Sequence, residues 1–352
     1  MSSSLYIHIP FCKQKCRYCA FHSAAATEPQ KEQYCQALLQ AIEKAEHRPC
    51  ATLYFGGGTP ALLGAERLAR VVEKIRQTFT LLPDAELTIE LNPESTTPEL
   101  LSALKEMGFN RISLGVQSLN DSELTYLGRL HTAERAKEAL AEIFAAGFQN
   151  VSADVMFGIP EQTEESFSAT LDTLLSYPIT HLSAYGLQWE EGTPLGNAPQ
   201  PMEEEAEEAL WLLLCQKAKA AGLEHYEISN FAKEGYASKH NTAYWRRTDY
   251  LGIGPAAHSF LNGVRYSAPE DTAAFISNPD PLQNPLPISA REAYEEAVML
   301  GLRTKEGIPL SLLPKDFDFE RHRDFSYVEQ NRFILNERGF YLSNAIIQGV
   351  LQ

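Results

Sequence analysis

The feature that most constrains the fold of this chain is a regular alternation of short apolar, β-branched runs with stretches of helical periodicity. Strands are predicted at 5–9, 52–55, 87–91, 111–116, 151–157 and 181–187, and helices at 28–46, 65–79, 98–107, 133–146 and 164–176. Such alternation implies a parallel sheet, because parallel neighbours need a crossover connection. No Gly-x-Gly-x-x-Gly turn follows the first strand, so we predict an α/β fold with a partial (β/α)6 TIM-like barrel.

The regular alternation of strand and helix patterns ends after residue 196. A loop and a helix through Gly222 precede a seventh predicted strand at 224–229, and the region from 230 to 285 is rich in aromatic residues, Gly and Pro. A helix over Ala290–Gly301, another near 326–338 and a final strand near 340–347 predict a small, helical, winged-helix-like domain. We therefore expect three parts: a barrel over 1–200, a barrel extension over 201–285 and a C-terminal domain over 286–352.

Charge and hydropathy exclude several classes of function. The formal net charge of -16 argues against nucleic-acid binding and against binding to anionic membranes. No run approaches the ~18 to 20 apolar residues that span a bilayer, and the first residues lack the features of a signal peptide. We expect a cytoplasmic protein that meets membranes only through its targets. Clustered cysteines are then metal ligands rather than disulfide partners.

Three cysteines stand directly after the first predicted strand. Cys12, Cys16 and Cys19 have the spacing C-x3-C-x2-C, at the strand end where barrels place functional residues. Neighbouring thiolates select iron–sulfur clusters, copper(I) or zinc. A four-iron cluster held by three cysteines keeps one iron open, as a catalytic metal centre does. The alternatives are three buried free cysteines, or a zinc site completed by His8 or His22.

Polar residues also mark the ends of the next strands. The second strand ends in "FGGGTP", where glycine lets the backbone approach a ligand closely. Glu90 and Asp154 lie within apolar strands, and Gln117 and Arg129 follow the fourth strand. Because a charged group in a buried strand is costly unless it is paired, each residue is a candidate for a site or for a structural ion pair.

Together these motifs resemble the radical S-adenosylmethionine (SAM) superfamily, and more narrowly its coproporphyrinogen III oxidase-like family. The matching blocks are "YIHIPFC", "GGGTP", "SLGVQSLND", "LGRLH", "DVMFGIP" and "YLGIGPAAHS", and the likeness extends into the tail. The resemblance implies a radical SAM barrel with a [4Fe–4S] cluster on Cys12, Cys16 and Cys19, whose fourth iron SAM chelates. It also implies a set of residues that line SAM: Tyr6, Tyr18, Gly57, Gly58, Thr59, Glu90, Gln117, Arg129 and Asp154. Gln188 falls where the oxidase contacts a second SAM.

This family contains an oxygen-independent coproporphyrinogen III oxidase and a haem chaperone. Three features favour the chaperone. Phe21 stands where the oxidase pattern has a further cysteine, only five residues precede Tyr6, and "KHNTAYW" matches the H-N-x-x-Y-W motif of the chaperone. The sequence leaves open whether the chain catalyses a radical reaction, whether it forms a homodimer, and which donor, such as a flavodoxin or ferredoxin, reduces the cluster.

The chaperone reading makes haem a cargo that passes to haem-receiving proteins. A neutral imidazole is a common axial ligand of haem iron, which makes His240 the preferred ligand and His258 the alternate. Tyr244 and Trp245 offer flat apolar faces to a porphyrin. Lys239, Arg246 and Arg247 are available for the haem propionates. The alternative is that His240 and Asn241 cap a loop and that Trp245 belongs to the core.

Overall fold

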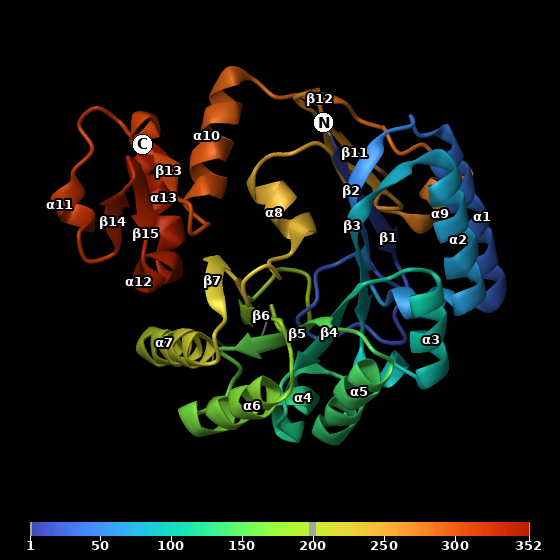
Figure 1. Cartoon of the computed structure of the whole chain (residues 1–352), viewed down its shortest axis with the longest axis horizontal. Helices are drawn as coiled ribbons and strands as arrows, with labels where there is room; N and C mark the ends of the chain where they lie inside the picture. The colour runs from blue at the N-terminus through green and yellow to red at the C-terminus, as the bar shows by residue number, and fades with distance from the viewer. Residues whose placement is uncertain (1, 197–201, 352) are drawn as a thin grey trace.

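The parallel core of the protein follows the alternation seen in its sequence. A computed structural model describes residues 2–196 and 202–351. Its first six strands pair in parallel, each with the next along the chain: β1 (Ser3–Ile9), β2 (Pro49–Gly57), β3 (Thr80–Leu91), β4 (Arg111–Gln117), β5 (Asn150–Phe157) and β6 (His181–Gly186). On its other side β1 pairs in parallel with β9 (Tyr250–Ile253). The N-terminal strand is therefore internal to the sheet (Figure 1).

The whole sheet has 12 strands in the order β12-β11-β10-β9-β1-β2-β3-β4-β5-β6-β8-β7. Antiparallel strands extend both ends of the parallel core: β7 (Glu224–Glu227), β8 (Asn230–Ala232), β10 (His258–Leu261), β11 (Val264–Ser267) and β12 (Leu286–Pro287). Within the described ranges no pairing joins the two end strands, so the barrel is open. The predicted α/β fold with a partial barrel is confirmed, and the seventh predicted strand proves to be the antiparallel β7.

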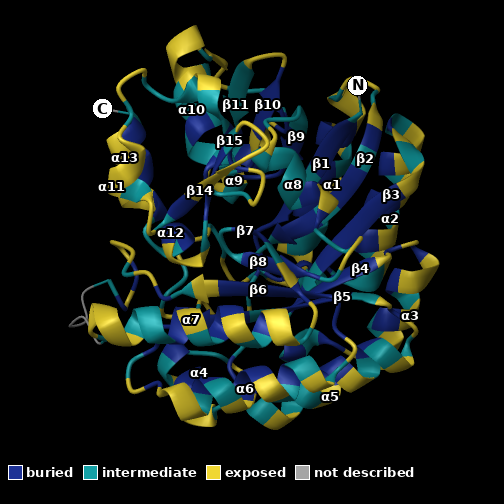
Figure 2. Ribbon diagram, turned by 60° about the vertical axis from the view of Figure 1, so that its left-hand side comes forward, coloured by how far each residue is buried: buried dark blue, intermediate teal, exposed yellow. Residues whose placement is uncertain are grey.

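Helices cover the outer face of this sheet. The predicted helices are α1 (Glu28–Lys44), α2 (Ala65–Thr78), α3 (Pro98–Glu106), α5 (Ala133–Ala145) and α6 (Glu164–Ser176), with the short α4 (Asp121–Leu127) in addition. Leu5 and Ile7 lie on one face of β1 and Ser4 and His8 on the other, and all four are buried, as in a strand covered on both faces. Figure 2 shows buried strands inside and exposed helix surfaces outside. Among the described helices, none is long and apolar enough to cross a membrane.

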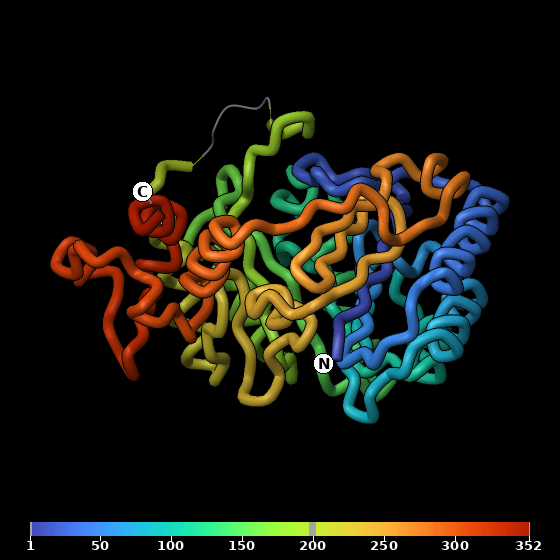
Figure 3. The backbone as a smooth tube through the Cα atoms, turned by 90° about the horizontal axis from the view of Figure 1, so that it is seen from above, coloured from blue at the N-terminus to red at the C-terminus, as the bar shows by residue number. Residues whose placement is uncertain are grey.

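The region from residue 202 onward returns to the first strand. It contains α7 (Glu204–Ala220), α8 (Lys239–Trp245) and α9 (Thr272–Ser277) besides strands β7 to β12. The segment around β9 to β11 runs beside the N-terminal strand when the molecule is viewed from above (Figure 3). The boundary expected at residues 200 and 201 lies outside the described residues.

The C-terminal part differs from its predicted secondary structure. Helix α10 (Ala290–Gly301) is found as predicted, followed by α11 (Phe319–His322), α12 (Glu337–Tyr341) and α13 (Ser343–Leu351). The helix expected near 326–338 and the strand expected near 340–347 are wrong: the first is a hairpin of β14 (Ser326–Glu329) and β15 (Arg332–Leu335), and the second is α12 and α13. Gln330 and Asn331 have φ angles of 48° and 62°, the geometry of a type I′ turn. Strand β13 (Ile308–Pro309) completes this three-stranded sheet.

Candidate cluster and cofactor site

The loops at the carboxyl ends of β1 to β6 surround one cavity of about 490 Å³. This is the end at which a parallel barrel collects its functional side chains. Every residue predicted for the cluster and for SAM lines this cavity except Tyr6, namely Cys12, Cys16, Cys19, Tyr18, Gly57, Gly58, Thr59, Glu90, Gln117, Arg129, Asp154 and Gln188. The structure thus brings together residues that the sequence scatters over 177 positions, from 12 to 188.

The three cysteines lie on a loop that is closed at its base. The amide of Cys12 donates to the carbonyl of Ala24 at 3.1 Å, and the amide of Ala24 donates to Pro10 at 2.9 Å. All three thiols are free and partly exposed. Burial raises the pKa of Cys19, and the neighbouring Cys16 raises it further. Metal binding would counter this effect, since a bound metal favours the thiolate.

The arrangement of donors fits a cluster better than a single ion. Among the described residues, no three His, Cys, Asp or Glu side chains converge closely enough to hold one metal ion. In a four-iron cluster each thiolate meets a different iron, so the sulfurs stay apart. His8 offers no nitrogen for zinc, because Nδ1 lies 3.1 Å from the Tyr6 hydroxyl and Nε2 lies 3.2 Å from the His22 carbonyl.

The glycine turn after β2 fits tightly against the cysteine loop. The amides of Gly58 and Thr59 donate to the carbonyls of Ile9 and Phe11 at 2.9 and 2.7 Å. A Cβ atom on Gly58 would lie 2.6 Å from the Phe11 carbonyl oxygen, closer than real Cβ contacts allow. Gly57 has a φ of 109°, a conformation that side chains rarely adopt. Glycine is therefore required here by the approach of the two loops.

Arg129 joins the cysteine loop to the ends of β3 and β4. Its Nη1 lies 3.5 Å from the Cys16 sulfur, and its Nη2 donates to Asn92 Oδ1 at 2.6 Å and to the Gly115 carbonyl at 2.9 Å. Its Nε is buried without a hydrogen-bond partner. An orphaned N–H at a cavity wall calls for an acceptor on a bound molecule, and the SAM carboxylate is one.

Asn92 is a site residue that the sequence reasoning missed. It lines the cavity, accepts from Arg129 and donates through Nδ2 to Thr59 Oγ1 at 2.8 Å. Asn92 lies two positions after Glu90 at the same strand end, and only this position in the sequence could have indicated its role.

Gln117 is marked as a candidate functional residue by its backbone, because its φ of 65° is unusual for a residue with a side chain.

Glu90 and Asp154 are buried carboxyl groups held by hydrogen bonds. Glu90 accepts from the Tyr54 hydroxyl at 2.7 Å and from the Gly57 amide at 3.2 Å, and burial raises its pKa to about 7. Asp154 accepts from the Ser113 hydroxyl at 3.0 Å, and burial raises its pKa to about 6. Neither group belongs to an ion pair in the part of the chain that the structure describes. The structural ion-pair alternative therefore does not account for them.

Tyr6 does not reach this cavity, contrary to what the resemblance implied. Its hydroxyl contacts the His8 ring, and its own ring lies 6.0 Å from Tyr54 and 6.3 Å from His240 between ring centres. Tyr6 thus belongs to an aromatic cluster behind the cavity wall. In this position it can support Tyr54 and the cysteine loop.

His240 is also placed differently from the expectation. The residue is 1% exposed, with Nδ1 2.7 Å from Thr52 Oγ1 and Nε2 2.9 Å from the Tyr244 hydroxyl. Burial lowers its pKa to about 3, and its ring stacks on Tyr54 at 4.8 Å. Both ring nitrogens have hydrogen-bond partners, so His240 offers no free nitrogen to a haem iron in this arrangement. The histidine instead supports Tyr54 and, through it, Glu90.

The other expected haem residues lie apart from one another. Tyr244 packs edge-on against Tyr250 at 4.6 Å, while Trp245 lines a second cavity on the opposite side of α8. His258 is exposed at the first position of β10. The core assignment considered for Trp245 therefore does not hold either.

Comparison with known proteins defines the class of this site. The sequence model of the Radical SAM superfamily matches residues 6–174. The structure of "Coproporphyrinogen III oxidase (HemN) from Escherichia coli" superposes with a TM-score of 0.83 over 99% of this chain and 89% of that chain, at 21% identity. Fold and cavity together are those of a radical SAM protein.

Curated relatives narrow the class further. The chain is 31% identical over 369 aligned positions to "Heme chaperone HemW" of Lactococcus lactis subsp. lactis, covering 99% of this chain and 97% of the relative. It is 35% identical over 321 positions to the Bacillus subtilis protein of that name, covering 87% and 84%. A bovine relative, "Radical S-adenosyl methionine domain-containing protein 1, mitochondrial", is 34% identical over 332 positions, covering 87% and 74%. This chain belongs to the HemW family.

Proposed function

We propose that this protein is a haem chaperone that binds haem and passes it to haem-receiving proteins. The observation that carries the proposal is the near full-length likeness to relatives named heme chaperones, 99% of this chain and 97% of the Lactococcus protein. The proposal includes a [4Fe–4S] cluster on Cys12, Cys16 and Cys19, with SAM at the open fourth iron. When bound, a reduced cluster of this kind supplies one electron to SAM.

The residues of this chain have distinct tasks in that site. The three thiolates hold the cluster, and the Gly57–Gly58 turn leaves room for a ligand to approach the backbone. Arg129 is held in place by Asn92 and offers its unpartnered Nε–H to a carboxylate. Glu90 and Asp154 accept hydrogen bonds now from protein groups and can accept them from a ligand's amine or hydroxyl groups.

Phe21 supports the chaperone over the oxidase. It lines the cavity mouth and is 69% exposed, at the position where the oxidase pattern carries a further cysteine. A phenyl ring cannot donate a proton or a hydrogen atom as a thiol can. The oxidase is the second candidate, because the cavity gathers the residues expected for the cluster and for SAM apart from Tyr6.

The proposal has further parts that need their own tests. It places the protein in the cytosol, where thiols stay reduced until a cluster binds. It assigns reduction of the cluster to a flavodoxin or ferredoxin type of donor, and it includes a homodimer as the form that carries haem. Pull-down with haem proteins of the same cell and analytical ultracentrifugation with and without the cluster address these parts.

One experiment separates the two candidate functions. Anaerobically reconstituted protein is incubated with SAM and a reductant, once with coproporphyrinogen III and once with haem. We expect a stable Soret band with haem and no decarboxylated product from coproporphyrinogen III. Formation of protoporphyrinogen at enzymatic rates would refute the chaperone assignment, and absence of haem binding would refute it as well.

A further inference from the structure

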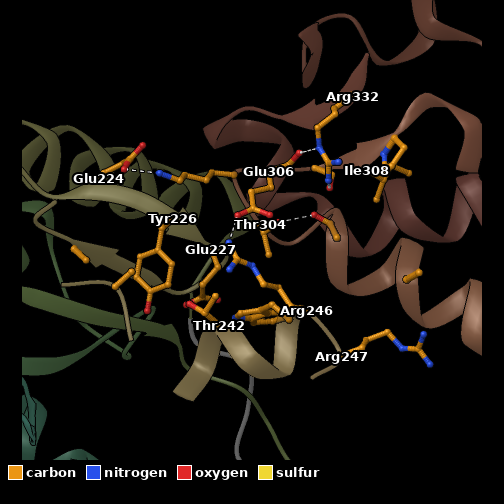
Figure 4. Close-up of a pocket in the computed structure, with 18 of the residues that line it drawn as sticks. Glu224, Tyr226, Glu227, Thr242, Arg246, Arg247, Thr304, Glu306, Ile308 and Arg332 are labelled. Atoms are coloured by element: carbon orange, nitrogen blue, oxygen red, sulfur yellow. Dashed lines mark hydrogen bonds and ion pairs between the residues drawn. The ribbon is translucent and has the colours of Figure 1, made fainter. Parts of the chain in front are cut away.

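A second cavity, of about 580 Å³, lies on the other side of α8. It is bounded by α8, by the β7–β8 hairpin and by the segment from α10 to β13 (Figure 4). It shares no lining residue with the SAM cavity. Its volume is within the range of roughly 300 to 1,000 Å³ that small-molecule and cofactor sites occupy.

Helix α8 presents different residues of its sequence motif to the two sides. His240 and Tyr244, four positions apart, contact each other and face the barrel. Thr242, Trp245 and Arg246 have the i, i+3, i+4 spacing of a second helix face, and all three line the second cavity. The tryptophan of the motif therefore contributes to this cavity, while its histidine holds the helix on the barrel.

The cavity lining carries a nearly balanced charge, although the protein as a whole is strongly acidic. Its lining contains five basic and four acidic side chains, whereas the whole chain has a net charge of -16. Arg332 donates to two backbone carbonyls, including Gly307 at 2.8 Å, and Lys233 forms no ion pair with any described residue. Neither cation is paired with a carboxylate of the described residues, so both can bind an anionic group.

Glu227 is an unusual wall residue for such a cavity. It has no exposed surface, and its Oε1 has no hydrogen-bond partner. Its Oε2 accepts only a long bond of 3.4 Å from the Ser229 amide. Figure 4 shows it on the same side of the cavity as Thr242 and Arg246. A buried oxygen that no protein group satisfies indicates a ligand that supplies a partner there.

Apolar surface completes the lining. Ile308, Pro309 and Leu312 form one wall, across from the helix that carries Trp245. A flat, largely apolar molecule with carboxylate groups and one polar centre matches this combination, because apolar walls bind the plane and the cations bind the edge. Among the ligands that the proposed function allows, haem has this chemistry.

We infer that this second cavity is the seat of the haem cargo, with the macrocycle between Trp245 and Ile308, and the propionates at Lys233 and Arg332. Glu227, whose Oε1 has no partner, is the group of this chain that would meet the iron or a water on it. The inference rests on the proposed function, since only that function makes haem the ligand. It moves the haem site away from His240 and from the exposed His258.

The test is a titration of haem into the cluster-loaded protein, followed by the Soret band. Lys233→Glu is expected to weaken binding about 10-fold or more, the factor for one lost charge-assisted contact. Lys219→Glu is the matched control: this lysine is exposed on α7, lies outside the cavity lining and its replacement is expected to leave binding unchanged. Glu227→Gln keeps the shape of the side chain and is expected to shift the Soret maximum, which a purely structural role would leave in place.

The outcomes separate failure of the haem-binding function from failure of the cavity assignment. If the wild type binds no haem, the proposed function fails and the inference with it. If the wild type binds haem and Lys233→Glu, Arg332→Glu and Glu227→Gln all match the control in affinity and spectrum, the cavity is not the seat although the function stands. Loss of binding in His258→Ala alone would likewise overturn the inference. Circular dichroism and the SAM-induced change in the cluster spectrum must match the wild type in every variant used.

Discussion

Replacing His240 tests whether the α8 motif supports the SAM cavity. His240→Ala removes a fully buried ring that stacks on Tyr54 and contacts Thr52 and Tyr244. Each hydroxyl left without a partner costs about 1 to 3 kcal/mol, and the lost packing adds about 2 kcal/mol. With two such hydroxyls, we expect the free energy of unfolding to fall by about 4 to 8 kcal/mol. Because Tyr54 donates to Glu90, we also expect weaker SAM binding, measured by the SAM-induced change in the cluster's electron paramagnetic resonance spectrum.

The stabilisation that His240 contributes is expected to depend on pH. His240 has a pKa of about 3 in the folded protein, lowered by burial, against about 6.5 in an unfolded chain. The unfolded state therefore binds the proton more readily, and the stabilisation from His240 is present above pH 6.5 and lost as pH falls toward 3. The difference in unfolding free energy between wild type and His240→Ala should be about 2 kcal/mol smaller at about pH 5 than at about pH 7.5.

Urea titrations under anaerobic conditions, followed by circular dichroism at both pH values, measure this difference. His258→Ala is the control, because this histidine is exposed and its replacement should change stability by about 0.5 kcal/mol at most. A loss below about 1 kcal/mol in His240→Ala, or a difference that does not shrink in acid, would refute the buried network as the role of this residue.

Three further predictions concern the cluster and SAM cavity. The triple Cys12/Cys16/Cys19→Ala variant should lose the [4Fe–4S] absorbance and keep its far-ultraviolet circular dichroism; a retained cluster would show that other ligands hold it. Gly58→Ala should load several-fold less cluster per chain, by iron and sulfide analysis, because its Cβ would lie 2.6 Å from the Phe11 carbonyl, whereas Gly349→Ala, with open space around its Cβ, should load normally. Arg129→Lys keeps the charge but loses the Nε–H and the planar fork, so SAM affinity should fall about 10-fold by isothermal titration while the cluster remains; unchanged affinity would remove Arg129 from the SAM site.

The sequence predicted the barrel and most of its cavity because both depend on local patterns. Each candidate residue stood at or just after a predicted strand, and parallel strands bring their carboxyl ends to one edge. The role of His240 depends instead on a contact with Thr52, 188 residues away, which no local pattern reveals.

The C-terminal hairpin was missed for a different reason. Its turn is Gln330–Asn331 rather than the Asn-Gly or Asp-Gly pair that usually signals a type I′ turn. Without that signal, the neighbouring apolar residues fit a helical period as well as a strand period. The second cavity could not be predicted either, because the three segments around it meet only through the packing of the C-terminal part on α8.

The internal position of β1 has a consequence for synthesis of the protein. The strand that leads into the cysteine loop pairs with β2 on one side and with β9 on the other, and β9 ends at residue 253. At about 5 to 20 residues per second, a ribosome needs roughly 10 to 40 s to pass from β2 to β9. During that interval one edge of β1 has no native partner, and this long-range pairing slows completion of the fold. The nascent chain thus exposes its three thiols on an incomplete barrel, and a cluster that enters then would stabilise the loop before the last parallel strand arrives.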